Sequence, residues 1–162
     1  MEQTILEISA QIRDIMVRSG KTVSTAESCT SGQIAALLTS VSGSSDYFQG
    51  GLTAYQNSVK TRFLSVNPQD IETYDVVSHQ VAEQMVQGAC RMFGTDYALS
   101  STGYAEGGNG TIPSGTIWIA WGSEDDVHSR CLTDDNGRNE NTRNAAEMAL
   151  RAFLDYIIQV YA

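Results

Sequence analysis

The sequence predicts a layered α/β/α fold with a mixed, partly parallel sheet, formed by a single domain over residues 1–162. Three observations support this fold class. Segments with helical periodicity alternate with short apolar segments along most of the chain, which is typical of strands joined by crossover helices. The length of 162 residues matches one domain. The 41% content of hydrophobic residues is that of a globular protein.

The first half of the chain predicts three helices separated by two strands. Apolar residues recur at helical spacing from Ile5 to Met16, and Gly20 follows as a stop signal. A loop is expected in SGSSDYF, at 42–48. The other expected elements are a strand at 21–26, a helix from about 28 to 41, a strand at 51–55 and a short helix at 57–66 that ends before Pro68.

The second half predicts a further helix and strand and then a hairpin. The helix starts at Ser78 and carries on one face Val81, Met85, Ala89 and Met92. The following elements are a buried strand at 96–102, a Gly-rich loop at 104–115, two strands at 116–122 and 127–133 that pair as a hairpin, and a C-terminal helix that buries Ala149, Phe153, Ile157 and Val160. Ligands of such folds bind where strands lead into helices, so the loops at 27–32 and 104–115 are the expected site.

The composition excludes several classes of function. The net charge of −9 makes the chain a poor partner for polyanions, so we expect neither nucleic acid nor membrane as a partner. The three cysteines are widely spaced and the two histidines, His79 and His128, belong to no ligand motif, so we expect no metal. Neither a signal peptide nor a membrane-spanning pattern is visible, and we expect a cytoplasmic protein.

The stretch STAESCTSG, at 24–32, gathers five Ser or Thr residues where a strand turns into a helix. Ser28 has two interpretations there. It is an N-cap whose oxygen accepts a free backbone N–H, or it is a nucleophile beside N–H groups that hold an oxyanion or a phosphate. Cys29 is either a competing nucleophile or a small buried side chain. The residues alone leave these alternatives open.

A serine nucleophile needs a base. His79 and His128 have no recognisable motif around them, whereas Lys60 becomes a base if burial lowers its pKa. Lys60 follows Tyr55 by five residues, at a corner from which both side chains can reach one cleft. From spacing alone, a solvated lysine and a packed aromatic ring remain the alternatives.

The segment from Ala26 to Val66 resembles the CinA C-terminal domain family, also the nicotinamide-nucleotide amidase family. It follows in register the family pattern AESCTGG…AGSS..F..G..TYSN..K...L.V. Further similar segments extend the resemblance over nearly the whole chain; they are DVVSHQVAEQMVQGA, DYALSSTGYAEGG, PSGTIWIAW and NGRNENTRNAAEMAL. The larger family members carry an additional N-terminal domain, and the resemblance leads us to expect a single domain without it over residues 1–162.

The resemblance implies an amidase that converts nicotinamide mononucleotide to nicotinic acid mononucleotide and ammonia, in pyridine nucleotide salvage. It implies a homo-oligomer and no metal or organic cofactor. In the catalytic set that it implies, Ser28 attacks the amide, Lys60 activates the hydroxyl and Tyr55 relays the proton. The substrate-binding residues expected with this set are Thr30 and Ser31, whose backbone N–H groups stabilise the oxyanion, and Gly103, Tyr104, Arg138 and Arg143, with the two arginines for phosphate.

The chain departs from the family pattern in two places. Ser31 replaces a glycine, and the loop that follows the strand at 96–102 has Tyr104 for Ile, Glu106 for Gly and Gly107 for Pro. Glu106 adds a negative charge beside the expected phosphate site, and Tyr104 either stacks on a pyridine ring or blocks it. Three functions therefore remain open: the nicotinamide mononucleotide amidase, a related amidase with a shifted substrate, and a non-catalytic nucleotide-binding protein that kept the fold.

Overall fold

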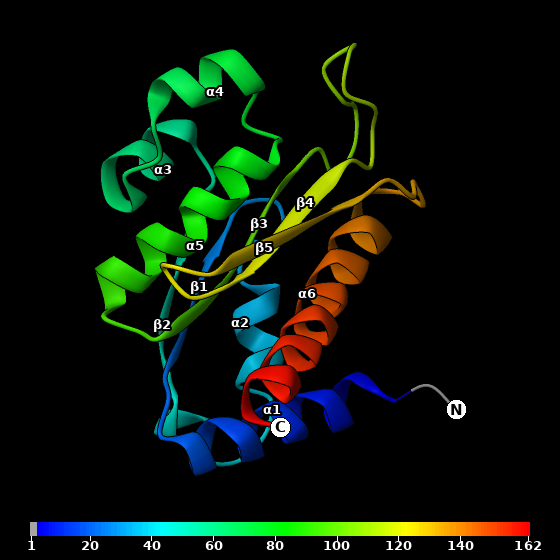
Figure 1. Cartoon of the computed structure of the whole chain (residues 1–162). Helices are drawn as coiled ribbons and strands as arrows, with labels where there is room; N and C mark the ends of the chain where they lie inside the picture. The colour runs from blue at the N-terminus through cyan, green and yellow to red at the C-terminus, as the bar shows by residue number, and fades with distance from the viewer. Residues whose placement is uncertain (1–2) are drawn as a thin grey trace.

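The computed structural model describes residues 3–162. Its centre is a five-stranded mixed sheet in the order β2-β1-β3-β4-β5 (Figure 1). β1 pairs in parallel with β2 and β3, and β4 pairs antiparallel with β3 and β5, so the expected mixed, partly parallel sheet is confirmed. The strands are β1 Val23–Glu27, β2 Phe48–Thr53, β3 Tyr97–Gly103, β4 Ile117–Gly122 and β5 Val127–Leu132.

Helices cover both faces of the sheet, which makes three layers. α5 packs on one face, with α3 and α4 on its outer side. α2 and α6 pack on the other face, and α1 lies across their ends (Figure 1). The helices are α1 Ile5–Ser19, α2 Gln33–Leu38, α3 Asn57–Leu64, α4 Pro68–Tyr74, α5 His79–Phe93 and α6 Arg138–Tyr161, with a short 3₁₀ turn at Ser44–Asp46.

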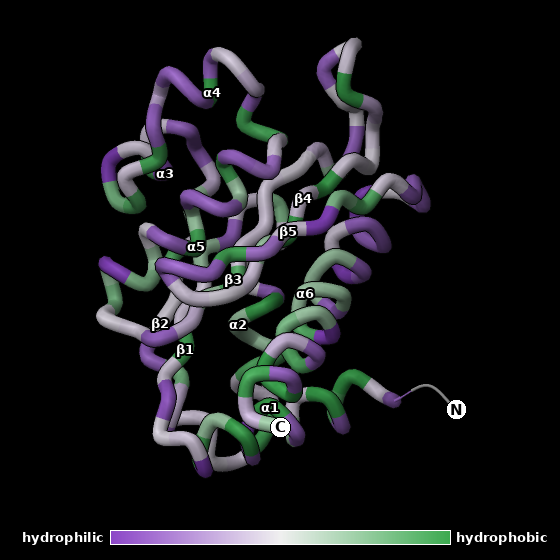
Figure 2. The backbone as a smooth tube through the Cα atoms, in the orientation of Figure 1, coloured by the Kyte–Doolittle hydropathy of each residue, from purple (hydrophilic) through white to green (hydrophobic). Residues whose placement is uncertain are grey.

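The sheet separates two hydrophobic cores. Successive side chains of a strand point to opposite faces, so Leu99 joins the core under α1, α2 and α6, whereas Ala98 joins the core under α5. Phe153 of α6 and Met85 of α5 are buried in the first and the second core, respectively. In Figure 2 hydrophobic residues recur along α1 and α6, and hydrophilic residues predominate along α4.

The order of the sequence-predicted elements is confirmed, but two boundaries are wrong and one helix was missed. The helix expected from about 28 to 41 covers only Gln33–Leu38, because Gly32 has a left-handed backbone and starts the helix there. The strand expected at 51–55 lies at Phe48–Thr53. α4 was not expected at all: Pro68 starts a helix, capped by the side chain of Asn67, as well as ending the segment before it.

Two residues expected on buried helix faces are exposed. Met92 has 44% of its surface exposed and Val160 has 47%, while the other residues of both expected faces are buried. Both lie within the last two residues of α5 or α6, and in α5 the next residue, Phe93, packs against the core in place of Met92. Periodicity alone does not decide which of two neighbouring residues faces the core at a helix end.

The contact between α5 and α3 gives a prediction for Gly88→Ala. Inside a helix this change ordinarily stabilises by about 0.5–1 kcal/mol. Here a Cβ at Gly88 would collide with the backbone carbonyl of Leu64 at the end of α3, so the two helices would have to separate. We expect the free energy of unfolding, measured by urea denaturation, to fall by about 1–3 kcal/mol. Unchanged or increased stability would contradict this close approach.

Candidate active site

A cleft lies where the three parallel strands end. Ser28 directly follows β1, Tyr55 comes two residues after β2, and Gly103 is the last residue of β3. The carboxyl ends of parallel strands meet at one edge of a sheet, which brings these positions together. The cleft has a volume of about 210 Å³ and is lined by Ser28, Cys29, Tyr55, Asn57, Lys60, Val76, Thr102, Gly103, Tyr104, Ala105, Glu106 and Arg138.

Ser28 and Lys60 are in direct contact at the floor of the cleft. The Lys60 Nζ lies 3.0 Å from the Ser28 Oγ and 2.9 Å from the backbone carbonyl oxygen of Tyr55. The Ser28 Oγ also lies 3.5 Å from that carbonyl oxygen. Two groups that are 32 residues apart in the sequence thus form a hydroxyl–amine pair, oriented by one main-chain acceptor.

Lys60 is buried, with 1% of its surface exposed. Its hydrogen-bond partners among the described residues are the neutral oxygens of Ser28 and Tyr55. Burial therefore lowers the pKa of Lys60 to about 8, because removal from water penalises the ammonium form. A lysine with this pKa is partly neutral near pH 7 and has a lone pair available to accept a proton.

The two candidate nucleophiles differ in their state. Burial raises the pKa of the Cys29 thiol to about 11, so the thiol stays protonated at neutral pH. Ser28, in contrast, has an amine within hydrogen-bond distance of its hydroxyl. The geometry therefore favours Ser28 over Cys29 as the nucleophile.

The buried carboxylate of Glu27, and not the Ser28 hydroxyl, accepts hydrogen bonds from the first turn of α2. Glu27 is 1% exposed and its oxygens accept the backbone N–H groups of Ile34 and Ala35, at 2.8 and 3.0 Å. The Thr30 hydroxyl donates to the same carboxylate at 2.6 Å. Of the two interpretations of Ser28, the helix cap is therefore wrong: α2 starts five residues after Ser28, and the N–H groups of Ile34 and Ala35 are bonded to Glu27.

The hydroxyl cluster instead fixes the main chain around Ser28. The Ser28 N–H donates to the carbonyl and hydroxyl oxygens of Ser101, at 3.0 and 3.3 Å. The Ser101 hydroxyl is also 2.7 Å from that of Thr30. Sequence reasoning missed Glu27 and Ser101; the signal for Glu27 was a lone carboxylate at the end of an apolar strand, which must be bonded when buried.

Tyr55 contributes its main chain at the floor and its side chain at the mouth of the cleft. Its carbonyl oxygen contacts Lys60, whereas its phenol is hydrogen-bonded to Arg138 at 3.2 Å. Half of the Tyr55 surface is exposed. The structure thus brings Tyr55 to the site as expected, but its hydroxyl bonds to Arg138 instead of Lys60 or Ser28.

The expected substrate-binding residues divide into two groups. Gly103, Tyr104 and Arg138 line the cleft, whereas Thr30, Ser31 and Arg143 do not. Thr30 is buried behind Ser28, and the Ser31 hydroxyl is bonded to the Ser28 carbonyl. Arg143 is exposed and pairs with Glu140 one turn away on the same helix.

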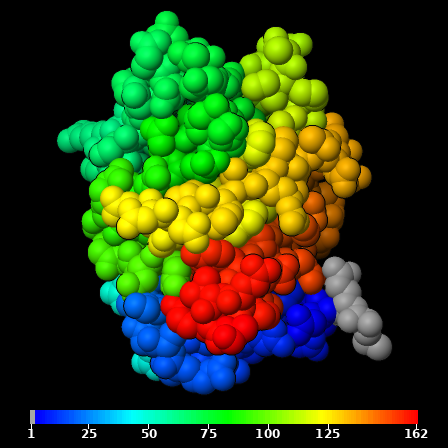
Figure 3. All heavy atoms as spheres, in the orientation of Figure 1, coloured from blue at the N-terminus to red at the C-terminus, as the bar shows by residue number. Residues whose placement is uncertain are grey.

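The wall formed by the loop after β3 is held in place by hydrogen bonds. The Tyr104 N–H and carbonyl bond to Thr116 and Gly115 across the base of the loop. The Tyr104 phenol donates to Asp75 at 3.1 Å, and burial, with this hydrogen bond, raises the pKa of Tyr104. Asn109 donates to the same carboxylate at 2.8 Å, so the loop is tied to the segment after α4, beside which it projects in Figure 3.

Two kinds of site have no candidate in the described part of the chain. Within residues 3–162, no group of three or more His, Cys, Asp or Glu side chains is arranged to hold a metal ion. None of the helices there combines the length and the apolar character needed to cross a bilayer.

Comparison with known proteins gives a consistent result. A family model described as the CinA C-terminal domain matches residues 5–157. A CinA-like protein of Rippkaea orientalis is 46% identical over 114 residues, which are 69% of this chain and 27% of that protein. A CinA-like protein of Cytophaga hutchinsonii is 39% identical over 137 residues, which are 83% of this chain and 33% of that protein. The chain spans about a third or less of the length of these relatives.

Solved structures share the fold over almost the whole chain. The competence/damage inducible protein CihA from Agrobacterium tumefaciens has a TM-score of 0.89 and 32% identity, covering 98% of this chain and 99% of that chain. The competence damage-inducible protein A from Klebsiella pneumoniae has a TM-score of 0.91 and 25% identity, covering 96% of this chain and 98% of that chain.

The role of Glu27 gives a prediction about stability. Glu27→Ala leaves two backbone N–H groups and one hydroxyl without their buried acceptor. We expect the free energy of unfolding to fall by about 3 kcal/mol or more, measured by chemical denaturation. Glu7→Ala is the matched control, because Glu7 caps α1 in an exposed position; we expect it to cost about 1 kcal/mol or less. Equal effects of the two changes would contradict the structural role of Glu27.

Proposed function

Because the chain belongs to the CinA C-terminal domain family, we propose that it is an amidase that hydrolyses the carboxamide of nicotinamide mononucleotide, releasing ammonia. The observation that carries the proposal is the buried Lys60 amine, 3.0 Å from the Ser28 hydroxyl and with its pKa lowered to about 8. The substrate is the one that the resemblance in AESCTSG and the following segments implies.

The chemistry starts with proton transfer from Ser28 to Lys60. The neutral amine of Lys60 accepts the hydroxyl proton while the Ser28 Oγ attacks the carboxamide carbon. The resulting Lys60 ammonium then donates this proton to the departing nitrogen, and ammonia leaves. The Tyr55 carbonyl accepts a hydrogen bond from Lys60 throughout and keeps the Nζ directed towards Ser28.

The tetrahedral intermediate carries a negative oxygen that needs donors. The Ser31 N–H already donates to the Ser28 carbonyl, and the first amides of α2 are bonded to Glu27. Among the described residues, the N–H groups of Cys29 and Thr30 donate to no main-chain carbonyl. These two amides, immediately after the nucleophile, are the donors assigned to the oxyanion in this mechanism.

Deacylation uses the same residues in reverse. Water enters the open cleft, Lys60 accepts its proton, and the hydroxide attacks the acyl carbon. Ser28 then leaves with a proton from Lys60, and the carboxylate product departs. The chain's own residues therefore supply the nucleophile and the proton carrier for both half-reactions.

A second candidate is a related amidase with a different substrate. Glu106 lies at the mouth of the cleft, 3.3 Å from Arg138, the residue expected to bind phosphate. The reaction at Ser28 would be unchanged, and only the part of the substrate outside the carboxamide would differ.

The first experiment measures ammonia released from nicotinamide mononucleotide by the purified chain. We expect Ser28→Ala and Lys60→Ala each to lower kcat by at least about 10³-fold, because both groups act in one step. Cys29→Ala is the matched comparison and should retain activity within about tenfold, since a neutral thiol takes no part in the reaction. Loss of activity in Cys29→Ala together with full activity in Ser28→Ala would show that the nucleophile is Cys29 and contradict the assignment of Ser28.

The lowered pKa of Lys60 predicts the pH dependence of the rate. The reactive form is the neutral amine, which predominates above a pKa of about 8. We expect kcat/KM to rise about tenfold for each pH unit below 8 and to level off above it. Initial rates of ammonia release between pH 6 and 9.5 test this. A flat profile, or a rate that falls as the pH rises from 6 to 8, would show that Lys60 is not the base.

A further inference from the structure

One exposed ion pair stands at the mouth of the cleft. Arg138, the first residue of α6, lies 3.3 Å from Glu106 of the loop after β3. The same guanidinium donates to the Tyr55 phenol at 3.2 Å. Glu106 and Arg138 both line the cleft that contains Ser28, so a substrate whose carboxamide reaches Ser28 passes this pair.

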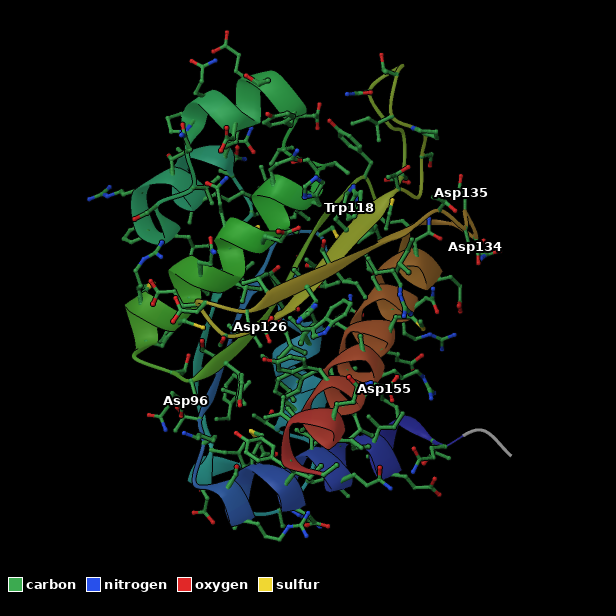
Figure 4. The ribbon with its side chains drawn as sticks, in the orientation of Figure 1. Asp96, Trp118, Asp126, Asp134, Asp135 and Asp155 are labelled. Atoms are coloured by element: carbon green, nitrogen blue, oxygen red, sulfur yellow. The ribbon has the colours of Figure 1, made fainter. Side chains whose placement is uncertain are left out.

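The pair is held by a buried amide rather than by its own charges alone. Asn141 follows Arg138 by one helical turn and is 5% exposed. Its side chain donates to the carbonyl oxygen of Ala105, the residue before Glu106, and to Asp135, each at 2.9 Å. Figure 4 shows Asp135 beyond the end of β5, beside the start of α6. The start of α6 and the backbone next to Glu106 are thus tied together.

The charges at the cleft leave little room for an anion. Among the described residues that line it, the cations are Lys60 and Arg138 and the anion is Glu106. Lys60 is buried at the floor, where it contacts the nucleophile. Arg138 is therefore the cation available at the mouth, and Glu106 already neutralises it.

A phosphate group would meet this arrangement unfavourably. A phosphomonoester carries between one and two negative charges near pH 7. To bind Arg138 it must come within a few ångströms of the Glu106 carboxylate, where like charges repel. Arg143 does not add a second positive charge for the phosphate, because it lies outside the cleft and pairs with Glu140.

A pyridinium ring without a phosphate would meet it favourably. The ring of an N-ribosyl nicotinamide is a cation, which a carboxylate attracts and an aromatic face stabilises. Glu106 supplies the carboxylate and Tyr104 lines the same wall, with its phenol fixed by Asp75. The mouth of the cleft thus suits a cationic head group better than an anionic tail.

We propose that Glu106 is a specificity-determining residue: it opposes the phosphate of nicotinamide mononucleotide, so that the cleft takes the unphosphorylated pyridinium nucleoside at least as well as the nucleotide. The inference rests on the proposed amidase function, whose chemistry at Ser28 it leaves unchanged. In this proposal the exposed Glu106–Arg138 pair determines the preference between the nucleotide and the nucleoside, which carry the same carboxamide.

The test compares the wild type with Glu106→Gln on both compounds, at low ionic strength. We expect KM for the nucleotide to fall at least threefold, KM for the nucleoside to stay the same or rise, and kcat to change less than twofold for either. The difference should shrink in 0.5 M salt, because exposed charges are screened. Glu140→Gln is the matched control: it removes one exposed carboxylate from α6 outside the cleft, and both KM values should stay unchanged.

Binding measurements keep the inference separate from the proposed reaction. Calorimetric titration of both compounds into Ser28→Ala, with and without Glu106→Gln, measures the affinity ratio without turnover. A threefold or larger shift towards the nucleotide supports the role of Glu106, even if no ammonia is ever released and the amidase proposal fails. An unchanged ratio, the same shift in Glu140→Gln, or no binding of either compound to either protein would overturn it.

Discussion

The buried carboxylate of Glu27 is the contact on which the rest of the site depends. It ends β1 and accepts three hydrogen bonds, two from the first turn of α2 and one from Thr30. Thr30 in turn contacts Ser101, which accepts the N–H of Ser28 from the neighbouring strand β3. The Glu27 carboxyl group thus links β1 to α2 directly and to β3 through Thr30 and Ser101. These contacts fix the turn that carries Ser28. A buried charge is tolerated because every donor around it is used.

Lys60, in contrast, is buried without a hydrogen-bond partner of opposite charge among the described residues. Its partners are a hydroxyl and a carbonyl, neither of which carries a charge that would stabilise an ammonium ion. The fold therefore surrounds the Glu27 carboxyl group with three donors, whereas burial lowers the pKa of Lys60 and favours its neutral form. This asymmetry reduces stability at neutral pH, because protonating Lys60 is harder in the folded chain than in the unfolded one. Active sites commonly retain such locally unfavourable groups, since the chemistry requires them.

The sequence predicted the layered fold and two of the loops that line the cleft, because periodicity and strand–helix alternation are local properties of the chain. It failed where long-range contacts decide. A helix cap was one of two interpretations of Ser28, but the helix starts after the left-handed Gly32 and its first N–H groups bond to Glu27. The phenol of Tyr55 turned to Arg138, which is 83 residues away. The hydrogen bond from the Asn141 side chain to the Ala105 carbonyl joins residues that are 36 positions apart, so no local sequence pattern predicts it.

The floor and the mouth of the cleft follow different physical rules. At the floor, Lys60 is dehydrated, so its behaviour is set by packing and changes little with salt. At the mouth, Glu106 and Arg138 are 63% and 48% exposed at the side chain, so their charges act through water and weaken as salt is added. A substitution of Lys60 at the floor affects packing and the proposed chemistry together. A substitution of Glu106 or Arg138 at the mouth leaves both hydrophobic cores unchanged. Under the proposed function, a single surface substitution at the mouth would therefore change substrate preference while the hydroxyl–amine pair at the floor stays intact.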